Sequence, residues 1–194
     1  MLHRLLKRVL DQIDYVNKAT LEKVIRLAVE IAREGREGRK VGTLFVISDS
    51  ENVLKYSRPL ILDPLLGHPD ERKHIDDPNL RETIKELALL DGGFVVSDDG
   101  ICLSACRHIE ASVEGIELPL GLGSRHVAAA SVTKRTLSVA VVVSESAVVR
   151  IFFHGEIISR ITPEMWSLSR HERPVKGACR EGADGGRDRG TEGG

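Results

Sequence analysis

Apolar side chains recur at every third or fourth position in three parts of the chain, which is the spacing of one face of an α-helix. The first part covers residues 2–16. The second begins near Thr20, which can serve as its N-cap, and ends in the polar segment 33–40, and the third covers 79–90. A further helix is predicted over 125–135, where three consecutive alanines favour helix.

Short runs of β-branched and aromatic residues, bounded by turn residues, alternate with these helices. The hairpin signal Asp98-Asp99-Gly100 separates two of them. Segment 49–78 has no lasting period and is predicted to be mostly loop. Helices interleaved with hairpin-linked strands indicate an α/β (α+β) fold, a mixed β-sheet flanked by helices in a single domain. The predicted strands are 42–48, 94–97, 101–106, 136–144, 147–153 and 157–161.

The length of 194 residues is enough for one domain with a sizeable core. We divide the chain into an N-terminal amphipathic helix over 1–19, a domain over 20–169 and a polar tail over 170–194. The tail is rich in Gly, Arg, Glu and Asp, and it has too few apolar residues to bury the surface that ordering requires. We therefore expect the tail to be disordered.

The composition is that of a soluble globular protein, with 41% hydrophobic and 29% charged residues. The formal net charge of -1 provides no long-range positive field, so neither nucleic acid nor an anionic membrane is expected as the main partner. No stretch approaches the roughly 20 apolar residues of a membrane span, and the basic N-terminus lacks a signal-peptide pattern. The three cysteines are sparse and odd in number, which argues against a disulfide framework. We expect a cytoplasmic protein.

The first candidate for chemistry is Asp91-Gly92-Gly93, at a predicted junction between a helix and a strand. Glycines let a ligand approach the backbone closely. A carboxylate there can hold a divalent cation or accept a hydroxyl proton. The alternative is a helix stop followed by a strand, and the motif alone does not decide between the two.

The second candidate is the glycine-bearing loop that leads into Ser124, Arg125 and His126 at the start of a predicted helix. Free N–H groups and the positive end of the helix dipole favour an anion at this point, and Arg125 and His126 add donors for phosphate oxygens. A triphosphate would suit such a site. The alternative is a surface helix whose N-cap is Ser124.

The third candidate is Ser144-Glu145-Ser146, where a hydrophobic strand ends abruptly in polar groups. A hydroxyl and a carboxylate at a strand end can form one wall of a site and contribute a phosphate contact or a metal ligand. The alternative is that these residues only form a turn.

Zinc binding by Cys102, Cys106 and His108 is a competing hypothesis, because alternate residues of a strand share a face. Their spacing fits no common zinc template. Cysteine is also often a small buried hydrophobe, so a structural role is the preferred interpretation.

Taken in order, four segments of the chain resemble the diadenylate cyclase (DAC) domain family. They are Gly42-Thr43-Leu44-Phe45-Val46-Ile47, Asp91-Gly92-Gly93, Gly123-Ser124-Arg125-His126 and Ser144-Glu145-Ser146. The resemblance covers roughly residues 21–161 and is closer to archaeal than to bacterial members. The order and spacing of the four segments are more specific than any one alone. The family's domain is a mixed sheet flanked by helices, and it makes cyclic di-AMP from ATP with Mn²⁺ or Mg²⁺.

The resemblance also implies roles for individual residues. Asp91 would hold the metal and prepare the ribose 3′-hydroxyl for attack, while Arg125 and His126 would bind the phosphates. Glu145 would be the second acidic candidate for the metal. Ile109 would pack near adenine. The implied nucleotide-binding set is Gly92, Gly93, Ile109, Gly123, Ser124, Arg125, His126 and Ser144.

Three positions depart from the family's pattern. Gly93 replaces an alanine, Val127 replaces the last arginine of an Arg-His-Arg motif, and Ser146 replaces the second glutamate of a Ser-Glu-Glu motif. The two lost charges leave an alternative open, a weak or inactive regulatory domain that binds ATP or cyclic di-AMP. Another alternative is an interaction module that uses the N-terminal amphipathic helices.

Self-association follows from the stoichiometry that the resemblance implies. Each chain carries one copy of the motifs, whereas the product needs two nucleotides that present their 3′-hydroxyls to each other. An isologous pair of chains places identical sites opposite one another. We therefore expect a productive face-to-face dimer, alone or within a higher oligomer, with ATP as substrate and cyclic di-AMP as product.

Overall fold

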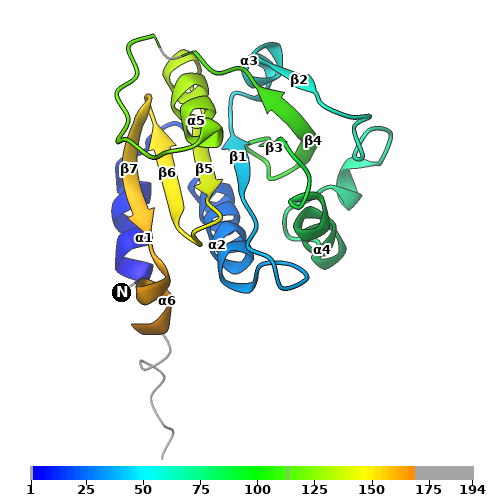
Figure 1. Cartoon of the computed structure of the whole chain (residues 1–194). Coiled ribbons are helices and arrows are strands. Elements are labelled where there is room, and N and C mark those ends of the chain that lie inside the picture. Colours follow the sequence, from blue (N-terminus) through cyan, green and yellow to red (C-terminus); the bar gives the residue numbers. More distant parts are fainter. Residues whose placement is uncertain (1, 113, 169–194) are drawn as a thin grey trace, which may run out of the picture.

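The computed structural model describes residues 2–112 and 114–168, so the expected disorder of 170–194 lies outside the described residues. The described strands are β1 (Thr43–Ile47), β2 (Ser57–Pro59), β3 (Gly93–Val96), β4 (Cys102–Ile109), β5 (Val139–Val143), β6 (Val149–Phe153) and β7 (Glu156–Ile161). They form one sheet in the order β2-β4-β3-β1-β5-β6-β7 (Figure 1). The pair β1–β3 is parallel, and the other neighbouring pairs are antiparallel.

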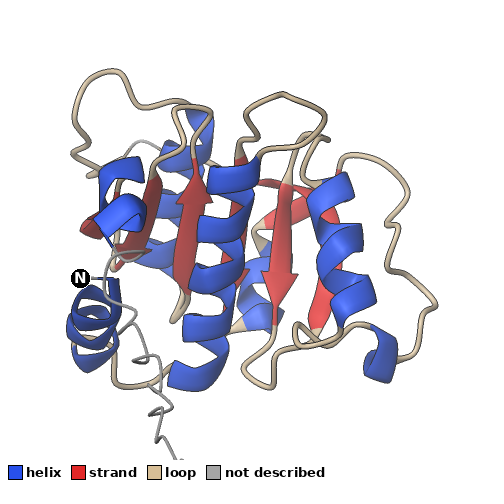
Figure 2. Cartoon of the chain, turned by 90° about the horizontal axis from the view of Figure 1, so that it is seen from below, coloured by secondary structure: helices blue, strands red, loops and turns tan. Residues whose placement is uncertain are grey.

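Helices cover both faces of the sheet (Figure 2). The described helices are α1 (Leu2–Asp11), α2 (Lys18–Glu34), α3 (Ser50–Lys55), α4 (Pro78–Leu87), α5 (Ser124–Arg135) and α6 (Pro163–Leu168), with a 3₁₀ turn η1 at Asp70–Arg72. Buried residues of α1, α2 and α4 share one hydrophobic core. Residues of α3 and α5 pack in a second core on the opposite face. The predicted mixed sheet flanked by helices is confirmed.

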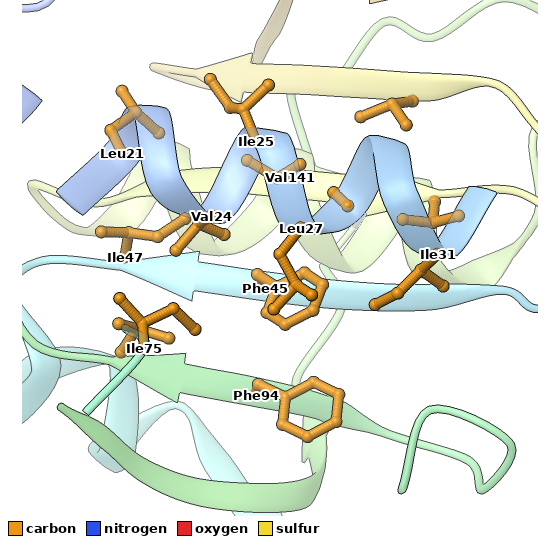
Figure 3. Packing of buried hydrophobic residues seen from close by; sticks show 14 of the residues in the cluster. Leu21, Val24, Ile25, Leu27, Ile31, Phe45, Ile47, Ile75, Phe94 and Val141 are labelled. Atoms are coloured by element: carbon orange, nitrogen blue, oxygen red, sulfur yellow. The ribbon is translucent and has the colours of Figure 1, made fainter. Parts of the chain in front are cut away.

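The central strands are buried along their whole length because they are covered on both sides. All residues of β1, β3 and β5 are buried. Phe45 and Phe94 are register partners on neighbouring parallel strands, and their rings stack at 5.0 Å in the core on the α2 face of the sheet (Figure 3). Leu44 and Val46 belong instead to the core on the α5 face. The alternation of side chains along one strand therefore serves two helix layers.

The pairing of β1, β3 and β5 brings distant loops to one edge of the sheet. Because β1 and β3 are parallel and β5 is antiparallel to β1, both parallel strands begin where β5 ends. Thr43 is the register partner of Val143, and Leu44 is that of Gly93. The segment before β3 and the turn after β5, which carry two of the candidate motifs, therefore meet there.

Several local predictions were wrong in detail. The N-cap of α2 is Asn17, whose side chain accepts hydrogen bonds from the N–H groups of Ala19 and Thr20. The Thr20 hydroxyl donates instead to the Asp98 carbonyl at 2.7 Å. Gly123 is the N-cap of α5, so Ser124 is the first helical residue rather than the cap. The predicted loop 49–78 contains α3, β2 and η1, each of which is too short to show a period.

Other local predictions were confirmed. Residues 98–100 form the turn between β3 and β4, with the Ser97 N–H donating to the Ile101 carbonyl at 2.9 Å. The predicted strands on either side of Glu145-Ser146 pair in antiparallel as β5 and β6. Within the described parts of the chain, no helix combines the length and the apolar character needed to cross a membrane.

A group of charged residues joins α2 to α4, and we call it the α2–α4 charge cluster. Lys85 Nζ lies 2.6 Å from a Glu30 carboxylate oxygen, 2.9 Å from Glu82 and 3.4 Å from Glu34. Arg81 pairs with the other oxygen of Glu30. The cluster ties the two helices together on the face of the sheet opposite α5.

Candidate functional site

A cleft of about 320 Å³ lies where β1 and β3 begin, between the end of β4 and the start of α5. Its volume is within the range of small-molecule sites. Six of the predicted site residues line it, although they come from three separate parts of the chain. They are Asp91, Gly92, Gly93, Ile109, Ser124 and Arg125.

Arg125 connects two of the sequence motifs. Its Nη2 lies 3.0 Å from Asp91 Oδ1, and its Nη1 lies 3.8 Å from Glu145 Oε1. The two carboxylates are open to solvent, with 89% of the Asp91 side chain and 75% of the Glu145 side chain exposed. A β-carbon at Gly42 would lie 2.9 Å from Arg125 Nη1, so the glycine leaves room for the guanidinium. The site therefore has an arginine between two carboxylates that a ligand can reach.

Gly92 and Gly93 are required by close approaches of the backbone. Gly92 has a φ of 106°, and a β-carbon there would lie 2.7 Å from the Cys106 carbonyl carbon. A β-carbon at Gly93 would lie 2.9 Å from the Leu44 carbonyl oxygen, although the resembling family has alanine at this position. Glycine thus lets the chain after Asp91 pass between β4 and β1, and it holds the carboxylate at the mouth of the cleft.

The start of α5 forms the wall that carries Arg125. The Gly123 carbonyl accepts a hydrogen bond from the His126 N–H at 3.0 Å, which closes the first turn. The first N–H groups of a helix have no partner within the helix. Together with the positive end of the helix dipole and the Arg125 guanidinium, they make this wall suitable for an anion.

His126 points away from the cleft into the protein. Its side chain is buried, its Nε2 lies 3.2 Å from Arg150 Nη1, and its buried Nδ1 has no hydrogen-bond partner in the described part of the chain. Burial, followed by the positive charges of Arg150 and Arg125, lowers the pKa of His126 to about 4. The imidazole is therefore neutral near pH 7, and the predicted phosphate contact stays a prediction.

Ser144 and Gly123 do not line the cleft either. The Ser144 hydroxyl lies 2.8 Å from the Ser146 hydroxyl, and it donates to the Val148 carbonyl at 3.0 Å. These contacts close the turn between β5 and β6, in agreement with the alternative that the motif forms a turn. The same turn places Glu145 beside Arg125, so it also contributes a wall of the site.

The cysteines of β4 belong to the core. Cys102 is fully buried, and burial raises the pKa of its thiol to about 12. Cys106 is also buried. His108 is exposed, and it is the register partner of Arg58 on the edge strand β2. Across residues 2–112 and 114–168, no group of three or more His, Cys, Asp or Glu side chains is arranged to hold a metal ion.

Sequence reasoning missed one charged residue of the cleft, Arg107. It lies in β4, two residues before Ile109, and lines the cleft with it. The alternation of side chains along a strand was the signal that could have found it, because a residue two positions from Ile109 shares its face.

Comparison with known proteins gives the family context. Residues 30–157 match the family described as DAC, DisA bacterial checkpoint controller nucleotide-binding. A Methanocaldococcus jannaschii protein named diadenylate cyclase is 46% identical over 154 residues, which are 79% of this chain and 48% of that protein. A Haloferax volcanii protein of the same name is 40% identical over 149 residues, 75% of this chain and 54% of that protein. The chain thus spans about half the length of the curated relatives it matches.

Two solved structures share the fold. One is a double mutant of DacA from Staphylococcus aureus, with a TM-score of 0.50 and 18% identity, covering 80% of this chain and 95% of that one. The other is described as a hypothetical membrane spanning protein from Bacillus cereus, with a TM-score of 0.54 and 18% identity, covering 75% of this chain and 68% of that one. At this identity the likeness concerns the fold alone.

Proposed function

The chain belongs to the diadenylate cyclase (DAC) domain family, and on this premise we propose that it joins two ATP molecules into cyclic di-AMP and releases pyrophosphate. The observation that carries the proposal is the juxtaposition of Asp91 and Arg125. They are 34 residues apart in sequence, yet they lie 3.0 Å apart at the mouth of a cleft backed by Gly92 and Gly93. A carboxylate beside a guanidinium is suited to act on a hydroxyl and a phosphate together.

The reaction consists of attack by a ribose 3′-hydroxyl on an α-phosphate. Asp91 would accept the proton of the hydroxyl or help orient it. Arg125 and the N–H groups at the start of α5 would stabilise the negative charge that develops on the phosphate. Ile109 and Ser124 would hold the nucleoside. Positioning and electrostatics supply most of the rate in this scheme.

Asp91 and Glu145 fit a divalent cation such as Mn²⁺ or Mg²⁺. These ions take oxygen ligands, and Mg²⁺ usually binds through one or two carboxylates together with substrate phosphates. The two carboxylates flank the same guanidinium and are largely exposed. The ion would neutralise charge on the phosphate oxygens. Because the chain supplies two carboxylates, the phosphates would complete the coordination.

The product requires two such sites that face each other. Each chain carries one cleft with one Asp91–Arg125 pair. In an isologous dimer each nucleotide presents its 3′-hydroxyl to the α-phosphate held by the other chain. We therefore propose that the active species contains two chains. Specific activity should rise with protein concentration in the dilute range if this dimer is weak.

A domain that binds ATP or cyclic di-AMP without turnover is the second candidate. It is favoured by Val127, which stands where the family has the last arginine of an Arg-His-Arg motif. It is favoured also by Ser146, whose hydroxyl bonds to Ser144 at a position where the family has a second glutamate.

One incubation separates the candidates. The purified chain is mixed with ATP and Mn²⁺ or Mg²⁺, and the products are identified by chromatography and mass. Cyclic di-AMP supports the cyclase, and ATP binding without product supports the regulatory domain. If the chain neither binds ATP nor forms product, the result supports the interaction module. The Asp91→Asn protein serves as the matched control, because any product that it forms at the wild-type rate comes from a contaminant or from another site.

A further inference from the structure

Among the described residues, Arg107 is a cation of the cleft without an acidic partner. The residue is partly buried and lines the cleft from β4, whereas Arg125 lines it from α5. In the described part of the chain, no Asp or Glu lies within ion-pair distance of Arg107, whereas Arg125 has Asp91 and Glu145. A partly buried charge without a partner is costly unless something neutralises it. The guanidinium therefore suits an anionic ligand.

The position of Arg107 is fixed by neutral groups. Its Nε donates to Ser57 Oγ at 2.8 Å, its Nη2 to the Ser57 carbonyl at 3.0 Å, and its Nη1 to Ser104 Oγ at 3.3 Å. A guanidinium has five N–H donors, so two are left for a ligand. The contacts hold the planar group in place without bringing a carboxylate within ion-pair distance of it.

The backbone of β4 supports this arrangement. Cys106 has a φ of 54°, and the register between β3 and β4 is irregular on both sides of Val95. Asp63 accepts a hydrogen bond from the Ser104 hydroxyl and one from the Ala105 N–H at 3.3 Å. The strand segment before Arg107 is thus tied to the loop that follows β2. Bulged strands of this kind often re-aim a side chain next to an active site.

We propose that Arg107 binds a phosphate group of the nucleotide from the β4 wall of the cleft; the inference rests on the proposed function for the identity of the nucleotide. An arginine has only donors and a fixed charge, and it matches phosphate oxygens in geometry. The apolar side chain of Ile109, on the same strand face, is the surface that suits the base. Arg107 and Arg125 would then hold phosphate oxygens from two walls of the cleft.

The test compares ligands that differ in their phosphates. Binding of a non-hydrolysable ATP analogue is measured by calorimetry, and binding of adenosine by ligand-detected NMR, for the wild type, Arg107→Gln and Arg107→Lys. Arg107→Gln should weaken binding of the ATP analogue about ten- to hundred-fold and leave adenosine within about two-fold. Arg107→Lys keeps the charge without the planar fork, so it should recover part of the loss. Arg58→Gln is the matched control, because it removes an exposed arginine from the neighbouring strand β2 and should change neither ligand.

Two outcomes would overturn the inference. Unchanged affinity of Arg107→Gln for the ATP analogue would show that the guanidinium does not contact phosphate. An equal loss for ATP analogue and adenosine would assign Arg107 to the base or to the shape of the cleft. The product assay is independent of both, since a wild type that makes cyclic di-AMP while Arg107→Gln binds normally contradicts only this inference. A wild type that binds the analogue through Arg107 without making product contradicts only the cyclase.

Discussion

Lys85 and Arg125 are both held by carboxylates from distant parts of the chain, but their partners enclose them to different degrees. The Lys85 side chain is 8% exposed, and three glutamates surround its ammonium group. Arg125 is 30% exposed, and its partners Asp91 and Glu145 are mostly in solvent. The first arrangement uses all three donors of an ammonium group. The second leaves donors and carboxylate oxygens for a ligand, so the same ionic chemistry serves structure in one region and binding in the other.

The pKa values follow the same contrast. For Lys85, burial opposes the charged form, but the hydrogen bonds that its ammonium group donates to Glu30 and Glu82 prevail and raise the pKa well above its usual value. For Glu30, burial is likewise outweighed by Lys85 and Arg81, and its pKa is lowered. Lys85 and Glu30 therefore remain ionised near neutral pH. The contribution of the α2–α4 charge cluster through Glu30 is present above the ordinary pKa of that carboxyl and is lost as the pH falls through the lowered value.

The largest effect is expected from Asp91→Asn, which removes one of the two exposed carboxylates beside Arg125. Turnover should fall by about 10² or more, the scale typical of a lost catalytic group, whereas ATP affinity should change little. Product formation is measured under saturating ATP, and circular dichroism reports the fold. Asp76→Asn, in an exposed pair with Lys23, is the matched control and should retain activity. Near-normal turnover by folded Asp91→Asn protein would contradict the assignment.

Arg125→Ala should weaken binding of a non-hydrolysable ATP analogue by about 1.5–3 kcal/mol, the range for a hydrogen bond to a charged group. Calorimetry measures the dissociation constant. Arg26→Ala removes an arginine that pairs with Glu22 on the surface of α2, and it should change the affinity by less than about 0.5 kcal/mol. Equal affinities for the two variants would mean that the start of α5 is an ordinary surface helix.

Lys85→Met instead removes the central cation of the α2–α4 charge cluster. It leaves Glu30, Glu34 and Glu82 without their shared cation, although Arg81 still pairs with Glu30. Because the glutamates are partly exposed, the free energy of unfolding should fall by about 1–3 kcal/mol, less than for a fully buried pair. Denaturant titration measures this change. The affinity for the ATP analogue should stay the same, and a large loss of affinity would show that the two regions are coupled.

The smallest effect concerns His126, whose pKa is lowered to about 4 by burial. The unfolded chain binds a proton near the ordinary pKa of about 6.5, whereas the folded chain does so only near 4. The contribution of the neutral His126 to the free energy of unfolding is therefore fully present above about pH 6.5, and it is lost as the pH drops toward 4. His126→Gln should reduce this loss by about 1 kcal/mol or more between pH 6.5 and 4.5. An identical pH dependence for wild type and His126→Gln would contradict the buried neutral imidazole.

The sequence was sufficient for the parts of the fold that have a clear period or turn signal. The hairpin at 98–100 was predicted from its turn residues, and the central strands were predicted from their short runs of β-branched and aromatic residues. The helix α3 and strand β2 were missed because six and three residues are too few for a period. Asn17 was missed as the cap of α2 because Thr20 offers the same chemistry three residues later.

The site was predicted in composition rather than in geometry. Asp91, Arg125 and Glu145 were proposed one by one, but their contact depends on the parallel pairing of β1 with β3 and on the reversed direction of β5. Arg107 carried no motif, and only its place two residues before Ile109 on the same strand linked it to the cleft. Sheet register is set by long-range packing, which a single sequence does not display.

The most direct test of the division between the two regions is the rate of cyclic di-AMP formation by wild type, Asp91→Asn and Lys85→Met, measured side by side. All three are assayed with ATP and Mn²⁺ at a temperature where each is shown to be folded. We expect product from the wild type, a similar rate per folded molecule from Lys85→Met, and a rate lower by about 10² or more from Asp91→Asn. No cyclic di-AMP from the wild type, or equal rates from wild type and Asp91→Asn, would contradict this expectation.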